Sequence, residues 1–243
     1  MQFLPFNTLY QLTADRLAGQ LAEADEFLLV PAKLDFWLTG ERRTERTNAS
    51  TTGLLNVSTG EWDDALIRRL GLPRGIFPEL IASGTRVGGL LPRVAAEIGA
   101  GPQATVTAVG SHDTASAVVA ITASTPDFAY ISCGTWGLVG VELEAPVLTE
   151  ASREANFTND GGVAGRLRFL PPVLGLWLLS ESVRAWEAEA ASIDLVSLLG
   201  AAAAVTTTVP IFDANDERFL APGDMPARIA GWLDRGGRFD EID

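Results

Sequence analysis

Two short segments of this chain carry residue types that act on phosphates and hydroxyl groups. The first, GSHDTASA, runs from Gly110 to Ala117 and follows the apolar run ATVTAV. The second, ISCGTWGL, runs from Ile131 to Leu138 and holds a glycine–threonine pair between two apolar runs. A carboxylate accepts the proton of an attacking hydroxyl, and the N–H groups of a tight turn bind phosphate oxygens. Together, these residue types predict transfer of a phosphoryl group onto a hydroxyl.

In the first segment the acid is Asp113, and it has two interpretations. As a general base it accepts the proton of a substrate hydroxyl; as a structural residue it only caps the helix that follows. Its neighbour His112 either forms a hydrogen bond with a sugar hydroxyl or is a satisfied structural histidine. Ser111, His112 and Asp113 are consecutive and therefore do not converge as a hydrolytic triad.

In the second segment, Gly134 and Thr135 either hold a phosphate oxygen or form an ordinary hairpin turn. The chain contains neither a GxxxxGK[ST] phosphate-binding loop nor a GxGxxG fingerprint. If the protein uses ATP, another architecture must bind it.

Composition narrows the chemistry further. The chain has 243 residues, 47% of them hydrophobic, and a net charge of -13, which disfavours nucleic-acid binding. One cysteine and one histidine exclude an intrachain disulfide and the usual structural zinc sites, so any metal needs oxygen ligands. We expect a divalent cation beside any nucleotide. No apolar stretch reaches the roughly 18 residues of a membrane span and no signal peptide is evident, so we expect a cytoplasmic protein.

The elements that would position these residues alternate between helices and strands. A buried strand is predicted over residues 104–109, then a helix capped by Thr114, so Asp113 falls in the turn where open α/β sheets bind ligands. STPDF, residues 124–128, is the predicted linker, and the runs on either side of Gly134 and Thr135 predict a hairpin. A helix is predicted after Thr13, with Leu17, Leu21 and Phe27 as candidates for its buried face. Other predicted helices follow Asp63 and Pro172, or span Pro92–Gly99 and Pro226 to about Arg235.

These motifs, in this order, resemble the FGGY family of sugar kinases, and most of all its rhamnulokinase branch. The resemblance covers almost the whole chain and rests on TNASTTGLLN, Trp62–Asp63, GSHDTASAVVA, ISCGTWGLVGVE, NFTNDGG, LGLWLL and FLAPGDMPARI. It implies an α/β, actin-like or ribonuclease H-like fold with two domains. Residues 1–125 would then belong to the N-terminal, sugar-binding domain and residues 126–243 to the C-terminal, ATP-binding domain.

The resemblance also implies an activity: ATP- and Mg²⁺-dependent phosphorylation of L-rhamnulose at its 1-hydroxyl, in L-rhamnose breakdown. Carried over by motif, Asp113 is the proton acceptor, and His112 and Thr114 flank it at the sugar. Gly134 and Thr135 contact ATP. No metal ligand and no oligomeric state are assigned.

Departures from the family pattern leave alternatives open. Pro172 and Ser180 stand where the family usually has asparagine and glutamine, so a kinase for xylulose, fuculose or glycerol is also possible. Family chains are about twice as long and carry an N-terminal phosphate hairpin and a later GGG motif. Neither motif occurs in this chain, so the sequence predicts a central piece, incomplete at both ends and inactive alone. We expect it to be either of low stability or dependent on a partner. A chain that binds sugar without transferring phosphate is a further alternative.

Overall fold

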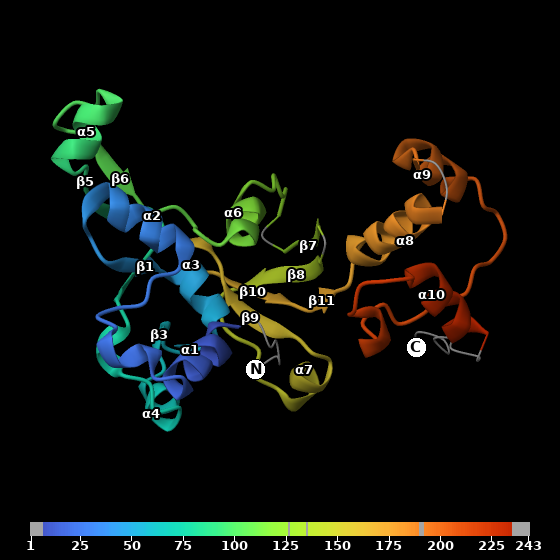
Figure 1. Cartoon of the computed structure of the whole chain (residues 1–243), viewed down its shortest axis with the longest axis horizontal. Coiled ribbons are helices and arrows are strands. Elements are labelled where there is room, and N and C mark those ends of the chain that lie inside the picture. The colour runs from blue at the N-terminus through green and yellow to red at the C-terminus, as the bar shows by residue number, and fades with distance from the viewer. Residues whose placement is uncertain (1–6, 126, 135, 190–191, 235–243) are drawn as a thin grey trace. The chain divides into compact units, whose positions relative to one another are not determined.

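The computed structural model describes residues 7–125, 127–134, 136–189 and 192–234 (Figure 1). They form two compact units. Unit 1 comprises Met1–Tyr130 and Gly140–Pro171, and unit 2 comprises Ile131–Val139 and Pro172–Asp243. The domain boundary expected between residues 125 and 126 stays a prediction. Among the described residues, none of the helices has the length and apolar character needed to cross a membrane.

The largest core of unit 1 lies under helices α1 (Thr8–Leu17) and α4 (Asp64–Arg69) and the hairpin of β2 (Leu55–Asn56) and β3 (Glu61–Trp62). At its centre, the rings of Phe27, Trp62 and Phe77 pack edge to face with centroids 5.2–5.8 Å apart. The indole N–H of Trp62 donates to the carbonyl of Pro78 at 2.8 Å, so burial leaves it satisfied. The buried members of this core are Leu9, Leu12, Ala49, Leu54, Trp62, Ile67, Leu72, Ile76 and Phe77.

The helix predicted after Thr13 is misplaced. Helix α1 begins at Thr8 and ends at Leu17, because Gly19 adopts the left-handed conformation (φ 76°) that terminates helices. Leu17, expected on the buried face, is 74% exposed. Leu21 and Phe27 do pack against the core, as expected.

A second region of unit 1 consists of two small sheets and their helices. Strand β1 (Arg43–Glu45) pairs in parallel with β4 (Glu79–Ile81), and β5 (Arg86–Gly89) pairs antiparallel with β6 (Thr105–Thr107). Helices α2 (Val30–Thr39) and α5 (Pro92–Ile98) accompany them, and α5 begins at a proline and ends at a glycine as predicted.

The buried strand expected at residues 104–109 is shorter and more exposed than predicted. Strand β6 spans three residues, and only the following Ala108 is buried, whereas Val109 is 67% exposed. In the described part of the chain β6 has a single neighbour, β5, so no sheet encloses it on both sides.

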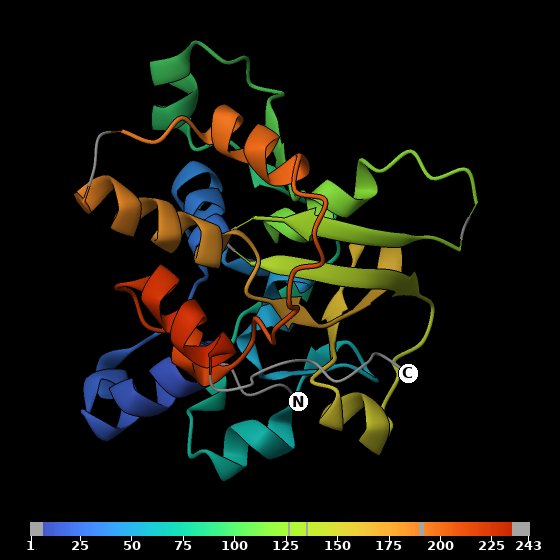
Figure 2. The same cartoon turned by 90° about the vertical axis from the view of Figure 1, so that its right-hand side faces the viewer.

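Five strands form the largest sheet, in the order β11-β8-β10-β9 with β7 also paired to β8. Strand β10 (Leu167–Leu170) pairs antiparallel with both β8 (Gly137–Leu143) and β9 (Thr158–Gly161). The short helices α3 (Arg46–Ala49) and α7 (Glu150–Glu154) belong to unit 1. Figure 1 shows α3 beside β9, which it contacts. The predicted hairpin is confirmed: β7 (Ala129–Cys133) pairs with β8, and Figure 2 shows the two yellow-green strands side by side.

Unit 2 is mainly helical, with α8 (Leu176–Glu189), α9 (Leu195–Ala203) and α10 (Met225–Leu233). Its core is Leu174, Leu178, Phe219 and Met225, packed against Trp177, Phe212 and Trp232. Helix α10 matches its prediction. Helix α8 begins later than predicted, because Pro172 and Val173 form β11 and pair with Leu138 and Gly137 of β8.

Candidate active site

Asp113 is an exposed acid, and one of its two carboxylate oxygens accepts hydrogen bonds from Thr114. It is the first residue of helix α6 (Asp113–Val119), and its side chain is 95% exposed. Its Oδ1 accepts hydrogen bonds from the N–H of Thr114 at 2.6 Å and from the Thr114 hydroxyl at 3.1 Å. The expectation that Thr114 caps this helix was wrong: His112 holds the cap position, and the threonine hydroxyl instead donates to Asp113.

A buried carboxylate from another strand anchors the loop before Asp113. Glu45, at the end of β1, is only 4% exposed, and its Oε2 accepts from both the N–H and the hydroxyl of Ser111, at 3.0 and 3.1 Å. Its other oxygen accepts from the N–H of Thr47 at 3.0 Å, and the Thr47 hydroxyl also donates to Glu45. That hydroxyl accepts from the N–H of His112 at 3.2 Å. Glu45 therefore connects β1, α3 and the loop that presents Asp113.

His112 contacts a buried arginine. Its Nδ1 lies 2.7 Å from Nη2 of Arg168, and its Nε2 lies 3.7 Å from Oδ1 of Asp113. Burial and the neighbouring Arg168 lower the pKa of His112, against the opposite effect of Asp160, Asp113 and Glu45. The imidazole is therefore favoured in its neutral form.

Arg168 is fully buried on strand β10. Its Nε donates to the carbonyl of Gly161 at 3.2 Å, and its Nη2 lies 3.6 Å from Oδ2 of Asp160, both on β9. Burial raises the pKa of the nearby Tyr130 hydroxyl, against the effect of the Arg168 charge. Within the described residues, Nη1 of Arg168 and the Tyr130 hydroxyl are buried without a hydrogen-bond partner.

Two glycines allow the backbone of this region to pack closely. A Cβ at Gly110 would lie 2.6 Å from Cγ2 of Val163, so the loop of the GSHD motif requires glycine there. The N–H of Gly161 donates a hydrogen bond to the Ser50 hydroxyl at 2.8 Å. A Cβ at Gly161 would lie 3.1 Å from that oxygen. Glycine at these two positions therefore lets the loop before α6 and the end of β9 pack closely against their neighbours.

Sequence patterns singled out the consecutive residues His112, Asp113 and Thr114, and their roles in the site stay predictions. Glu45, Asp160 and Arg168 were missed. A signal for Arg168 existed: in LRFL it alternates with apolar residues and shares the buried face of β10 with Leu170. Glu45 lies among polar residues in ERRTERTN, where no pattern indicates burial.

The turn of the second motif belongs to unit 2. The N–H of Gly134 donates to the carbonyl of Trp136 at 2.9 Å, and the carbonyl of Gly134 accepts from Leu176 at 3.1 Å. Thr135 lies outside the described residues. The expected ATP contacts of Gly134 and Thr135 thus stay predictions. Pro172 lies in β11 with its carbonyl accepting from Asn215 at 3.2 Å, and Ser180 is exposed on α8.

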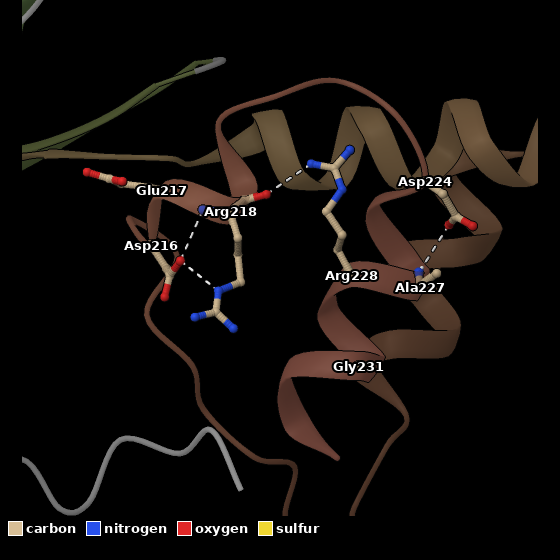
Figure 3. Close-up of a pocket in the computed structure, with 7 residues that line it drawn as sticks. All are labelled: Asp216, Glu217, Arg218, Asp224, Ala227, Arg228 and Gly231. Carbon is tan, nitrogen blue, oxygen red and sulfur yellow. Dashed lines mark hydrogen bonds and ion pairs between the residues drawn. The ribbon is translucent and has the colours of Figure 1, made fainter. Parts of the chain in front are cut away.

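Unit 2 also contains an open hollow of about 680 Å³, lined by Asp216, Glu217, Arg218, Asp224, Ala227, Arg228 and Gly231 (Figure 3). Its charged side chains form ion pairs and hydrogen bonds with neighbouring side chains and backbone groups. Arg218 pairs with Asp216 at 2.7 Å, Asp224 accepts from the N–H of Ala227, and Arg228 donates to the carbonyl of Arg218. These groups stabilise the turns around α10, and we assign no ligand to the hollow.

Over the described ranges, no three or more His, Cys, Asp or Glu side chains gather as they would around a metal ion. No residue is therefore assigned to Mg²⁺.

Comparison with known proteins identifies the family. The profile of the FGGY family of carbohydrate kinases, N-terminal domain, matches residues 2–120, and that of the C-terminal domain matches residues 129–240. The chain belongs to the FGGY family of carbohydrate kinases. Its relatives in that family include a rhamnulokinase of Pectobacterium carotovorum, 40% identical over 240 residues, and one of Klebsiella pneumoniae, 39% identical over 247 residues. These matches cover 98% and 100% of this FGGY-family chain but only 46% and 48% of the relatives.

Solved structures support the same assignment at the level of the fold. A ligand-bound xylulose kinase from Lactobacillus acidophilus matches with a TM-score of 0.67 at 18% identity, covering 83% of this chain and 41% of that protein. A gluconate kinase from the same species matches with a TM-score of 0.65 at 20% identity, covering 75% and 37%. The predicted α/β, actin-like sugar kinase fold is thereby confirmed.

Proposed function

We propose that this chain carries the sugar site of an ATP-dependent kinase that phosphorylates L-rhamnulose on its 1-hydroxyl. The observation that carries the proposal is Asp113: an exposed carboxylate, anchored through Thr114 and set beside His112 at the end of a loop held by Glu45. The rhamnulokinases that match along nearly the whole chain support the choice of sugar.

The proposed chemistry needs one base. As the substrate oxygen attacks the γ-phosphorus of ATP, Asp113 accepts the hydroxyl proton. A bond forms between that oxygen and phosphorus, the bond from phosphorus to the bridging oxygen breaks, and ADP leaves. A base of this kind contributes about 10²–10⁴-fold to the rate. Because Oδ1 of Asp113 is occupied by Thr114, we assign proton transfer to Oδ2.

ATP is the proposed phosphoryl donor, with Gly134 and Thr135 as its contacts and Mg²⁺ as the cation that neutralises its phosphates. We further propose a cytoplasmic enzyme. The roles of His112 and Thr114 at the sugar are part of the same proposal, since both adjoin Asp113 on α6.

A second candidate is an FGGY kinase for another sugar or polyol. Pro172 supports it, because a proline offers no side-chain amide to a substrate and its carbonyl already accepts from Asn215. Loss of a polar contact shifts specificity by orders of magnitude when a substrate hydroxyl depends on it. Xylulose, fuculose and glycerol are the competing substrates.

The test measures sugar binding by calorimetry and ADP formation by a coupled assay, with the same chain and a panel of L-rhamnulose, xylulose, fuculose and glycerol. We expect L-rhamnulose to bind best and any ADP formation to be greatest with it. Where ADP formation is measurable, Asp113→Asn should lower its rate about 10²–10⁴-fold. Asp64→Asn is the matched control, since Asp64 is an exposed acid on α4 whose carboxylate pairs with Arg74.

The outcomes decide the substrate, the ability to transfer phosphate and the identity of the base. Preference for another member of the panel overturns L-rhamnulose as the substrate. Sugar binding without ADP formation identifies a sugar-binding chain that does not transfer phosphate. If the chain is active and the Asp113→Asn variant forms ADP at the same rate, Asp113 is not the base.

A further inference from the structure

We propose that Arg168 is a positioning residue that holds His112 in its neutral tautomer with the proton on Nε2, and so aims an N–H donor at the ligand space beside Asp113. Neither the family match nor the motif that contains His112 assigns this role. The identity of the ligand as a sugar rests on the proposed function, whereas the tautomer rests on the geometry of unit 1 alone.

The contact between Arg168 and His112 determines the tautomer. A guanidinium has five N–H donors and no acceptor, and it stays protonated at any ordinary pH. Its Nη2 lies 2.7 Å from Nδ1 of His112, so Nδ1 must be the acceptor and carry no proton. A neutral imidazole then carries its single proton on Nε2.

Burial and the charge of Arg168 favour the neutral ring, whereas the three neighbouring carboxylates favour its protonation. Arg168 faces the ring from β10, Asp160 from β9, Glu45 from β1, and Asp113 from α6. Protonation of Nδ1 would set two donors and two positive charges against each other at hydrogen-bond distance. The side chain of His112 is only 22% exposed, and its burial further disfavours the protonated ring.

The arginine is itself fixed, which makes it suitable for positioning. Its Nε is bound to the carbonyl of Gly161, and Asp160 lies 3.6 Å from its Nη2. The backbone of His112 is held separately by the Thr47 hydroxyl. The backbone of His112 is thus held by α3 and its ring by β10, so the ring has little freedom to turn.

Nε2 faces the side of the acid without bonding to it. Its 3.7 Å separation from Oδ1 of Asp113 exceeds a hydrogen bond. A ligand oxygen beside the pair can accept from Nε2–H, while a second hydroxyl of the same ligand donates to the carboxylate. Paired hydroxyls of a sugar or polyol have this chemistry.

The single histidine makes a direct test possible, because the imidazole signals of the chain come from His112 alone. Two-bond ¹H–¹⁵N correlation spectra of the ¹⁵N-histidine-labelled chain distinguish the bare nitrogen from the protonated one. We expect a bare Nδ1 and a protonated Nε2 at neutral pH, and a pKa below about 6.5. A protonated Nδ1 in the unsubstituted chain overturns the proposal without any variant.

Variants then assign the effect to Arg168. In Arg168→Met we expect a mixture of tautomers and a higher pKa for His112, because Asp160, Asp113 and Glu45 are left without the opposing charge. Arg168→Lys retains a donor and should retain the tautomer. Arg166→Met is the matched control: it removes an arginine that binds Glu144 and the carbonyl of Glu142 and should leave the spectrum unchanged.

The readouts separate the two proposals. If Arg168→Met does not fold, Arg168→Lys and the unsubstituted chain still decide the tautomer. An unchanged tautomer and pKa in folded Arg168→Met overturn the role of Arg168. Addition of L-rhamnulose should shift the Nε2 signal; the expected tautomer with no such shift counts against the proposed substrate but supports the role of Arg168.

Discussion

Replacing Glu45 with glutamine tests whether a buried carboxylate holds the loop that presents Asp113. The substitution keeps the shape of the side chain and removes its charge. In the native chain one oxygen of Glu45 accepts from the N–H and hydroxyl of Ser111 and from the Thr47 hydroxyl, and the other accepts from the N–H of Thr47. All four donors point at a side chain that is 4% exposed.

The expected cost follows from these contacts. The amide oxygen of glutamine can replace the oxygen with three donors, but its NH₂ group then faces the N–H of Thr47. Leaving that buried donor unsatisfied costs about 1–3 kcal/mol, and three bonds that lose an ionic acceptor weaken by up to about 1 kcal/mol each. Because neighbouring terms are not additive, we expect a total loss of about 2–5 kcal/mol of unfolding free energy.

Urea unfolding followed by tryptophan fluorescence measures this loss, with Trp62 buried in the core of the same unit. Glu61→Gln is the control, since Glu61 pairs with Arg46 at the surface, where an ion pair is worth about 0–1 kcal/mol. A loss below about 0.5 kcal/mol for Glu45→Gln would show that the four hydrogen bonds do not stabilise the loop.

Two further predictions concern His112 and Gly140. Because the pKa of His112 is lowered in the folded chain, the unfolded chain binds a proton first, and stability should fall as the pH drops below about 6.5. His112→Gln should remove that part of the pH dependence, and the raised pKa values of Glu26 and Asp35, which act with the opposite sign, remain in both proteins. Gly140→Ala should cost about 1–3 kcal/mol in thermal unfolding, since its Cβ would lie 2.8 Å from Leu170 and from the Tyr130 hydroxyl. Gly89→Ala, with open space at its Cβ, should cost less; equal losses would contradict the packing argument.

Local signals predicted several elements well. Proline and glycine marked both ends of α5, and Asp63 capped α4 through its bond to the N–H of Leu66. The glycine–threonine pair correctly predicted the hairpin of β7 and β8. These features depend on neighbours in the sequence, where turn and cap preferences act directly. The long helix expected after Thr13 failed because apolar spacing continued past the glycine that ends α1.

The sequence by itself determined the family, the fold class and the segment that carries the candidate base, because motif order and local turn chemistry are written along the chain. Only the tertiary structure decided what supports that segment. Glu45 and Arg168 lie 66 and 56 residues from the groups they bind in the loop, and neither has a neighbour in sequence that indicates its partner. Buried charges require partners wherever the fold brings them, so these contacts are properties of the packed unit.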